Sequence, residues 1–167
     1  ARVFDAISWS QIYSFGLAFI IISLIMFGIF GSLKLGLVAI LPNTFPMLTV
    51  FGLMGWLEFN LDITTLMTAP IIIGIAVDDT IHFITHYRLS LLKGASISEA
   101  IHATLHEVGQ AIIFTTLILM SVFLFFIPVS HVGVSNFSIL AVIAVFSALL
   151  GDLFLLPALC RVLQIRV

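Results

Sequence analysis

Residues 63–84 read ITTLMTAPIIIGIAVDDTIHFI, an apolar run that contains two adjacent acids, Asp78 and Asp79. The hydrocarbon core of a bilayer is about 30 Å thick, and a helix crosses it with about 20 residues. Backbone hydrogen bonds must be satisfied internally in lipid, and this run lacks the alternation of a barrel strand. We therefore expect residues 63–84 to form a transmembrane helix with two carboxyls inside it.

Four further apolar stretches of similar length accompany this one. The sequence thus predicts an all-α membrane protein, a bundle of five transmembrane helices forming a single membrane domain over residues 1–167. Prolines inside the second and third stretches, Pro42, Pro46 and Pro70, should bend those helices. The predicted helices are Ile12 to Gly31, Leu35 to Trp56, Ile63 to Ile84, Ala111 to Val129 and Gly133 to Leu156.

The composition supports a lipid environment. Hydrophobic residues make up 62% of the chain and charged residues 8%, whereas soluble domains have roughly 45–50% apolar and about 25% charged residues. The net charge of -2 forms no basic stripe, so we expect no nucleic-acid partner. Cys160 is the single cysteine, which excludes an internal disulfide and a thiolate metal site made by this chain alone.

Basic residues predict the orientation of the helices, because they favour the cytoplasmic side of a membrane. Arg2 precedes the first helix, whereas the others fall between helices one and two, between three and four, or after five. We expect a periplasmic N-terminus and a cytoplasmic C-terminus. The chain starts at Ala1 without an initiator Met or a signal-peptide pattern, so we also expect it to belong to a longer protein. The other basic residues are Lys34, Arg88, Lys93, Arg161 and Arg166.

Ser96 followed by Glu99 forms a capping-box pattern between the third and fourth predicted spans. It predicts a helix that runs through Ala100 to Leu105. We expect this helix to lie along the cytoplasmic interface.

The acid pair is the strongest functional signal. At about 1.5 Å per helical residue, Asp78 lies about 15 Å from Arg88, near the middle of the membrane. An ionisable group there costs at least about 2.5 kcal/mol on insertion scales, so it must face protein or water. Two adjacent carboxyls in a low dielectric cannot comfortably both ionise, so one can bind and release a proton. A static pair, hydrogen-bonded to neighbouring helices, is the alternative.

Neighbouring residues extend this candidate site. His82 lies one turn after Asp78 and can relay protons or merely form a hydrogen bond. Gly74 lies one turn before it and allows another helix to approach closely. Thr115 and Thr116 lie at a suitable depth in the fourth helix, although threonine often bonds only its own backbone.

Two other polar residues suggest peripheral roles. We expect Asp152 to be a water-accessible carboxyl near the cytoplasmic end of the fifth helix. We expect His86 to lie in water at the interface.

These motifs resemble the membrane region of the resistance-nodulation-division superfamily, particularly its lipid and hydrophobe exporters, which include the mycobacterial large membrane protein group. The most specific element is Gly74-x-x-x-Asp78-Asp79, similar to that family's Gly-x-x-x-Asp-Asp motif. The supporting pieces are Ser10-Gln11, Leu41-Pro42-Asn43, Gly109-Gln110-Ala111-Ile112 and the run from Gly151 to Leu159.

The resemblance implies a secondary active transporter rather than an enzyme. We also expect no metal and no cofactor, because the five histidines do not complete a ligand set within one site. The transporter would export a hydrophobic or amphiphilic, lipid-like substrate from the bacterial inner membrane by proton antiport. Asp78 and Asp79 would form the proton relay, with Thr115 or Thr116 as hydroxyl partner. The chain looks like the five-helix part of the C-terminal half, so its partners would be the N-terminal membrane half, the periplasmic domains and a second copy in a homo-oligomer.

Other functions remain open on the same residues. The drug-exporting branch carries a lysine at the helix that matches residues 63–84, and this chain has none there, which argues against tripartite drug efflux. Accessory subunits of Sec-type protein translocation and sterol-sensing-like lipid-handling proteins share the architecture. The spacings of His82 with His86 and of His102 with His106 also suit a histidine-box metalloenzyme, which needs more histidines than the five present.

Overall fold

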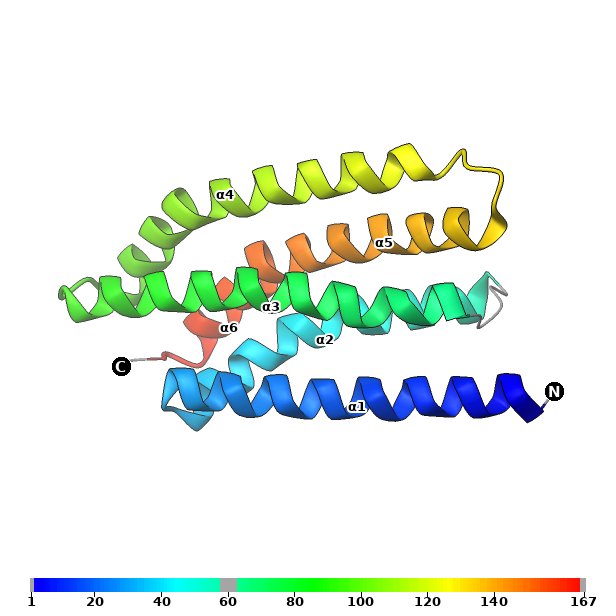
Figure 1. Ribbon diagram of the computed structural model, residues 1–167. Coiled ribbons are helices and arrows are strands. Elements are labelled where there is room, and N and C mark those ends of the chain that lie inside the picture. Colours follow the sequence, from blue (N-terminus) through cyan, green and yellow to red (C-terminus); the bar gives the residue numbers. More distant parts are fainter. Residues whose placement is uncertain (1, 58–62, 166–167) are drawn as a thin grey trace.

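The computed structural model describes residues 2–57 and 63–165 and arranges them as a bundle of long helices (Figure 1). No strand occurs in these residues, so the predicted all-α fold is confirmed. The elements are α1 (Arg2–Phe30), α2 (Leu33–Trp56), α3 (Ile63–Leu92), α4 (Ile97–Phe126), α5 (Val132–Leu150), the π-helical turn η1 (Gly151–Leu155) and α6 (Leu156–Val162).

The helix bounds differ from the prediction mainly at the helix ends. α1 begins at Arg2 and α3 continues to Leu92, because polar residues extend both helices beyond their apolar runs. The fifth predicted helix is interrupted by η1. Most of the predicted loop between Leu57 and Asp62 lies outside the described residues.

The capping box at Ser96 is confirmed. The Ser96 hydroxyl accepts a hydrogen bond from the Glu99 amide at 3.3 Å, and the Ser96 amide donates one to the Glu99 carboxylate at 2.8 Å. The helix that opens there continues without a break into α4, so the segment forms the first turns of α4 rather than a separate helix. Its position along a membrane interface stays a prediction.

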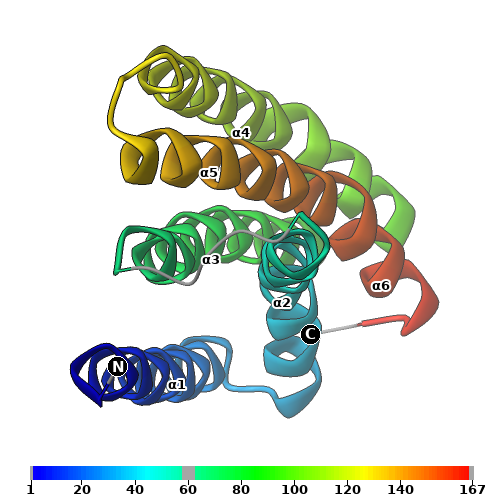
Figure 2. The ribbon, with the colours of Figure 1, turned by 90° about the vertical axis from the view of Figure 1, so that its right-hand side faces the viewer.

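α3 occupies the centre of the bundle. It contacts α1, α2, α4 and α5, whereas α1 packs mainly on α2 and α3 at one edge. Figure 2 shows α1 at this edge and α4 with α5 on the opposite side of α3. α1 begins at one end of the bundle and α6 finishes toward the other (Figure 1).

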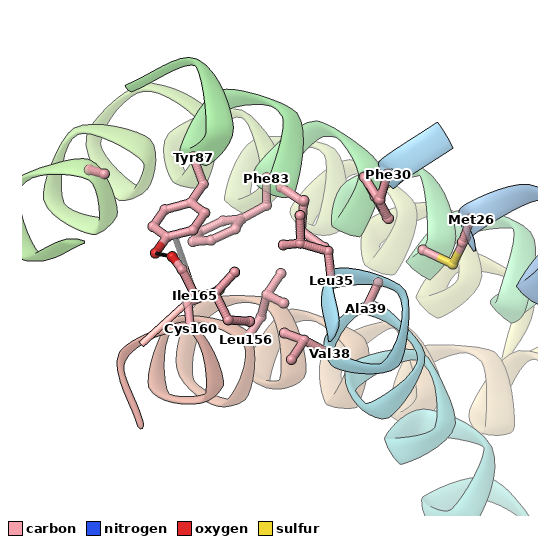
Figure 3. Packing of buried hydrophobic residues seen from close by; sticks show 12 residues of the cluster. Met26, Phe30, Leu35, Val38, Ala39, Phe83, Tyr87, Leu156, Cys160 and Ile165 are labelled. Carbon is pink, nitrogen blue, oxygen red and sulfur yellow. Dashed lines mark hydrogen bonds between the residues drawn. The ribbon is translucent and has the colours of Figure 1, made fainter. Parts of the chain in front are cut away.

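A buried cluster closes the end of the bundle where α6 lies (Figure 3). The Tyr87 hydroxyl in α3 donates a hydrogen bond of 2.8 Å to the Ile165 carbonyl after α6. The Arg88 guanidinium donates one of 3.1 Å to the Phe30 carbonyl at the end of α1. These two hydrogen bonds join α3 to the segment after α6 and to the end of α1. The cluster contains Met26, Phe30, Leu35, Val38, Ala39, Phe83, Ile84, Tyr87, Ala100, Leu156, Cys160 and Ile165.

The outer surface of the bundle is apolar. Exposed leucine, isoleucine and phenylalanine side chains cover α1, α2 and α4, among them Leu24, Leu48 and Phe114. Within the described residues, three helical stretches are long and apolar enough to cross a membrane, Leu33–Trp56, Ile97–Phe126 and Val132–Val162, and α1 adds the shorter run Gly16–Phe30. α3 carries the acid pair and packs among them.

Candidate functional site

Three consecutive residues of α3 point in different directions. Successive residues of an α-helix are rotated by about 100°, as 3.6 residues complete a turn. Asp78 is exposed on the outer side of α3, Asp79 is partly buried, and Thr80 is fully buried. The acid pair therefore stands between the surface of the bundle and its interior.

Asp78 and Asp79 open into a groove of about 650 Å³ between α3 and α4. Gly74 and Ile75 line the groove on α3, one turn before the pair. Thr115 lines it on α4, together with the apolar residues Ile118 and Leu119. The groove thus combines two carboxyls and one hydroxyl with mostly apolar walls.

The two threonines of α4 face different surroundings. The Thr115 hydroxyl donates to the carbonyls of its own helix, at 3.1 Å to Ala111 and 3.0 Å to Ile112, and remains in the groove. Thr116 is 2% exposed and does not line the groove. The structure therefore brings Thr115, and not Thr116, to the acid pair.

The predicted neighbours of the pair on α3 are only partly engaged. The His82 Nε2 atom lies 3.7 Å from the Asp78 Oδ1 atom, and both side chains are largely exposed. At Gly74, an added Cβ would meet no heavy atom within 4 Å, so no described helix packs against it. The close helix approach predicted there would need a segment outside this chain.

The prediction that water reaches Asp152 is wrong. Asp152 is 1% exposed, and its Oδ1 atom lies within hydrogen-bond distance, 2.7 Å, of the Thr80 hydroxyl oxygen. The Thr80 hydroxyl also lies 3.4 Å from the Asn43 Oδ1 atom of α2. The position of Asp152 near a helix end suggested exposure, but packing of η1 against α2 and α3 encloses it.

A buried polar node joins α2, α3 and η1 through the side chains of Asn43, Thr80 and Asp152. The sequence alone did not predict this node. The sequence contained partial signals. Thr80 directly follows the acid pair, and Asn43 and Asp152 each follow a residue with special backbone properties, Pro42 and Gly151. Nothing in the sequence indicated that the three side chains meet.

The remaining histidines show one contact of interest. The His86 Nδ1 atom lies 3.2 Å from the Glu107 Oε2 atom, which links α3 to α4. Among the side chains that the structure describes, no three of His, Cys, Asp or Glu gather as metal ligands would.

The fold and this groove define a multi-pass helical membrane protein that carries ionisable groups inside its membrane region, as transporters do. The chain belongs to the AcrB/AcrD/AcrF family, within the resistance-nodulation-division superfamily, because the model of that family matches residues 12–166. The resemblance inferred from the Gly-x-x-x-Asp-Asp motif is thereby confirmed.

Individual relatives are considerably longer than this chain. The chain is 30% identical over 102 residues to the hopanoid transporter HpnN of Burkholderia multivorans, covering 61% of this chain and 12% of HpnN. It is 26% identical over 150 residues to the toluene efflux pump membrane transporter TtgE of Pseudomonas putida, covering 86% of this chain and 14% of TtgE. It therefore corresponds to a small part of each.

A solved structure shares the fold. The translocon-associated membrane protein SecDF of Thermus thermophilus superposes with a TM-score of 0.86 at 21% identity. The match covers 95% of this chain and 22% of SecDF. At this identity the likeness establishes the architecture of the helices alone.

Proposed function

We propose that this chain is the proton-coupling membrane part of an exporter of hydrophobic or amphiphilic, lipid-like molecules. The observation that carries the proposal is the acid pair, which opens from the middle of α3 into the groove. Membership of the AcrB/AcrD/AcrF family supports it. Two relatives are named for apolar molecules, a hopanoid and toluene, which supports a hydrophobic substrate.

The pair would act as a proton relay in antiport. Protonation removes a charge, changes which neighbours the pair can bond, and so shifts helix packing between two arrangements. Moving one charge through 100 mV supplies about 2.3 kcal/mol. Thr115 and His82 would complete the relay, since Thr115 lines the same groove and His82 lies beside Asp78.

Exposure of the pair implies a covering element. The Asp78 side chain is 75% exposed in this chain, and an acid facing hydrocarbon is costly. We infer that another part of the complete protein covers the groove or encloses water there. The N-terminal membrane half is the proposed cover, with periplasmic domains attached to both halves.

The charge distribution supports the proposed orientation. Lys34 is in the first turn of α2, Arg88 is near the end of α3 and Arg161 is in α6. The start of α2, the end of α3 and α6 lie toward the same end of the bundle (Figure 1). Because basic residues favour the cytoplasmic side, this end would face the cytoplasm of a bacterial inner membrane.

The test uses the complete protein in proteoliposomes that carry a fluorescent lipid-like substrate and a proton gradient. Asparagine keeps the shape of aspartate but cannot titrate, so Asp78→Asn and Asp79→Asn should abolish gradient-driven export at normal protein levels. Glu99→Gln is the matched control, because it removes a carboxylate outside the groove and glutamine also completes a capping box. Normal export by the double asparagine variant would refute the relay.

Protein translocation is the competing outcome, given the fold shared with SecDF. Secretion of a reporter protein is measured in cells that carry the same variants. Loss of secretion with unchanged substrate export would replace export by translocation as the function of the acid pair.

A further inference from the structure

The buried node of Asn43, Thr80 and Asp152 lies behind the acid pair, on the inner side of α3. Asp152 is enclosed by segments of this chain itself, so other parts of a longer protein cannot supply its partner. Its Oδ2 atom meets no hydrogen-bond donor among the described residues. Among the described residues, no ion pair involves Asp152.

The hydrogen bonds of the node reveal the protonation state that suits it. A threonine hydroxyl carries one hydrogen, whereas an amide or carboxylate oxygen carries none. The Asn43 side chain is oriented by its NH₂ group, which donates a hydrogen bond of 2.7 Å to the Ala39 carbonyl. Its Oδ1 atom therefore faces Thr80 and can only accept.

Both contacts of Thr80 are satisfied together only when Asp152 carries a proton. A neutral Asp152 donates to the Thr80 oxygen across the 2.7 Å contact, and Thr80 then donates to Asn43. An ionised Asp152 takes the single Thr80 hydrogen, which leaves Asn43 Oδ1 without its donor and a buried charge without a cation. Both losses are unfavourable in the interior of a protein.

We propose that Asp152 is a second proton-binding residue of the transport machinery, protonated in the arrangement seen here and deprotonated during the cycle. Thr80 is its positioning residue. The inference rests on the proposed proton-coupled transport, which it extends from the groove into the bundle.

The position of Asp152 suits such a coupling. Asp79 lines the groove and precedes Thr80 directly in α3, so a change of charge at Asp79 takes place one residue away from the node. Loss of the Asp152 proton turns the Thr80 hydrogen away from Asn43 and breaks this hydrogen bond between α3 and α2. Asp152 also lies in η1, and π-helical turns occur frequently at functional sites.

Asp152→Asn separates a proton-binding role from a structural one. The amide NH₂ group can donate to Thr80, so asparagine reproduces the protonated node but cannot lose a proton. We expect the complete protein to keep its unfolding temperature and to lose gradient-driven export by about a hundredfold or more, the usual cost of removing a proton-transfer group. Unchanged export would overturn the inference.

Infrared spectroscopy tests the proton directly, independently of transport. The protein should show a carbonyl band of a protonated carboxyl that disappears in Asp152→Asn. The band should shift in Thr80→Val, which lacks the hydroxyl, and be retained in Thr80→Ser, which keeps it. Absence of any band assignable to Asp152 would overturn the inference.

Failure of this inference differs from failure of the proposed function. Normal export by Asp152→Asn, with export lost in Asp79→Asn, would overturn the role of Asp152 and leave the relay in the groove intact. Normal export by both variants would overturn both proposals.

Discussion

Gly151 of η1 packs directly against the carbonyl of Pro42 in α2. A Cβ atom built at Gly151 would lie 3.2 Å from the Pro42 oxygen. In an α-helix this carbonyl would bond to the amide four residues later, which here is Pro46 and has no hydrogen. Because Gly151 has no side chain, η1 can approach α2 at the point where α2 lacks a hydrogen bond. This approach buries the following residue, Asp152, inside the bundle.

Gly151→Ala should destabilise the protein. Overpacking costs about 1–3 kcal/mol, and the better helix propensity of alanine offsets at most about 1 kcal/mol. Gly16→Ala in α1 is the control, because its added Cβ meets nothing within 4 Å. Thermal unfolding in detergent should show a lower midpoint for Gly151→Ala alone. Equal midpoints would show that η1 tolerates the extra atom.

Gly74→Leu should block export without unfolding this chain. The new side chain enters the groove beside Asp78, where it would exclude a covering helix or water. Gly52→Leu in α2 is the matched control, since an added Cβ at either glycine meets nothing within 4 Å. Export and thermal unfolding are measured for both variants. Equal export rates would argue that the groove is not used.

The two threonines of α4 should respond differently to valine, which keeps their shape. Thr115→Val removes the hydroxyl from the groove and should slow export by about a hundredfold, because that hydroxyl is proposed to assist proton transfer. Thr116 does not line the groove, so Thr116→Val should leave the export rate near normal and affect only stability. Initial rates at matched protein levels decide between them. The reverse order would assign the relay hydroxyl to Thr116.

Labelling with a membrane-impermeant thiol reagent tests the orientation. Cys160 is 0% exposed, so we expect the reagent not to label the native cysteine of this chain. Ser98→Cys should react only from the cytoplasmic side, and Ser130→Cys only from the periplasmic side. Labelling of Ser98→Cys from the periplasm would invert the proposed topology.

Much of the architecture followed from local chemistry. A long apolar run must be helical in lipid, because no water is available for its backbone groups. The capping box was equally local, as Ser96 and Glu99 are three residues apart and bond to each other. The depth of the acid pair also followed from the sequence, since helical rise converts residue number into distance along the bundle.

Which side of each helix is buried was decided by tertiary structure. An amphipathic helix reveals its buried face by the period of its apolar residues, but a helix that is apolar all around does not. The sequence placed Asp152 near the end of a helix expected to stop at Leu156, whereas helical structure continues through η1 and α6 to Val162. The surroundings of Asp152 were misjudged as well. Its burial depends on Thr80, which lies 72 residues away in the chain.

The same distinction applies to the groove. The sequence by itself predicted two carboxyls in the middle of a membrane helix and a threonine pair at matching depth. Only the packing of α3 on α4 selected Thr115 and turned Thr116 away from the groove. Adjacent helical residues differ by about 100° in direction. The rotation of α4 relative to α3 therefore determines which threonine hydroxyl faces the acid pair, and no single sequence segment encodes that rotation.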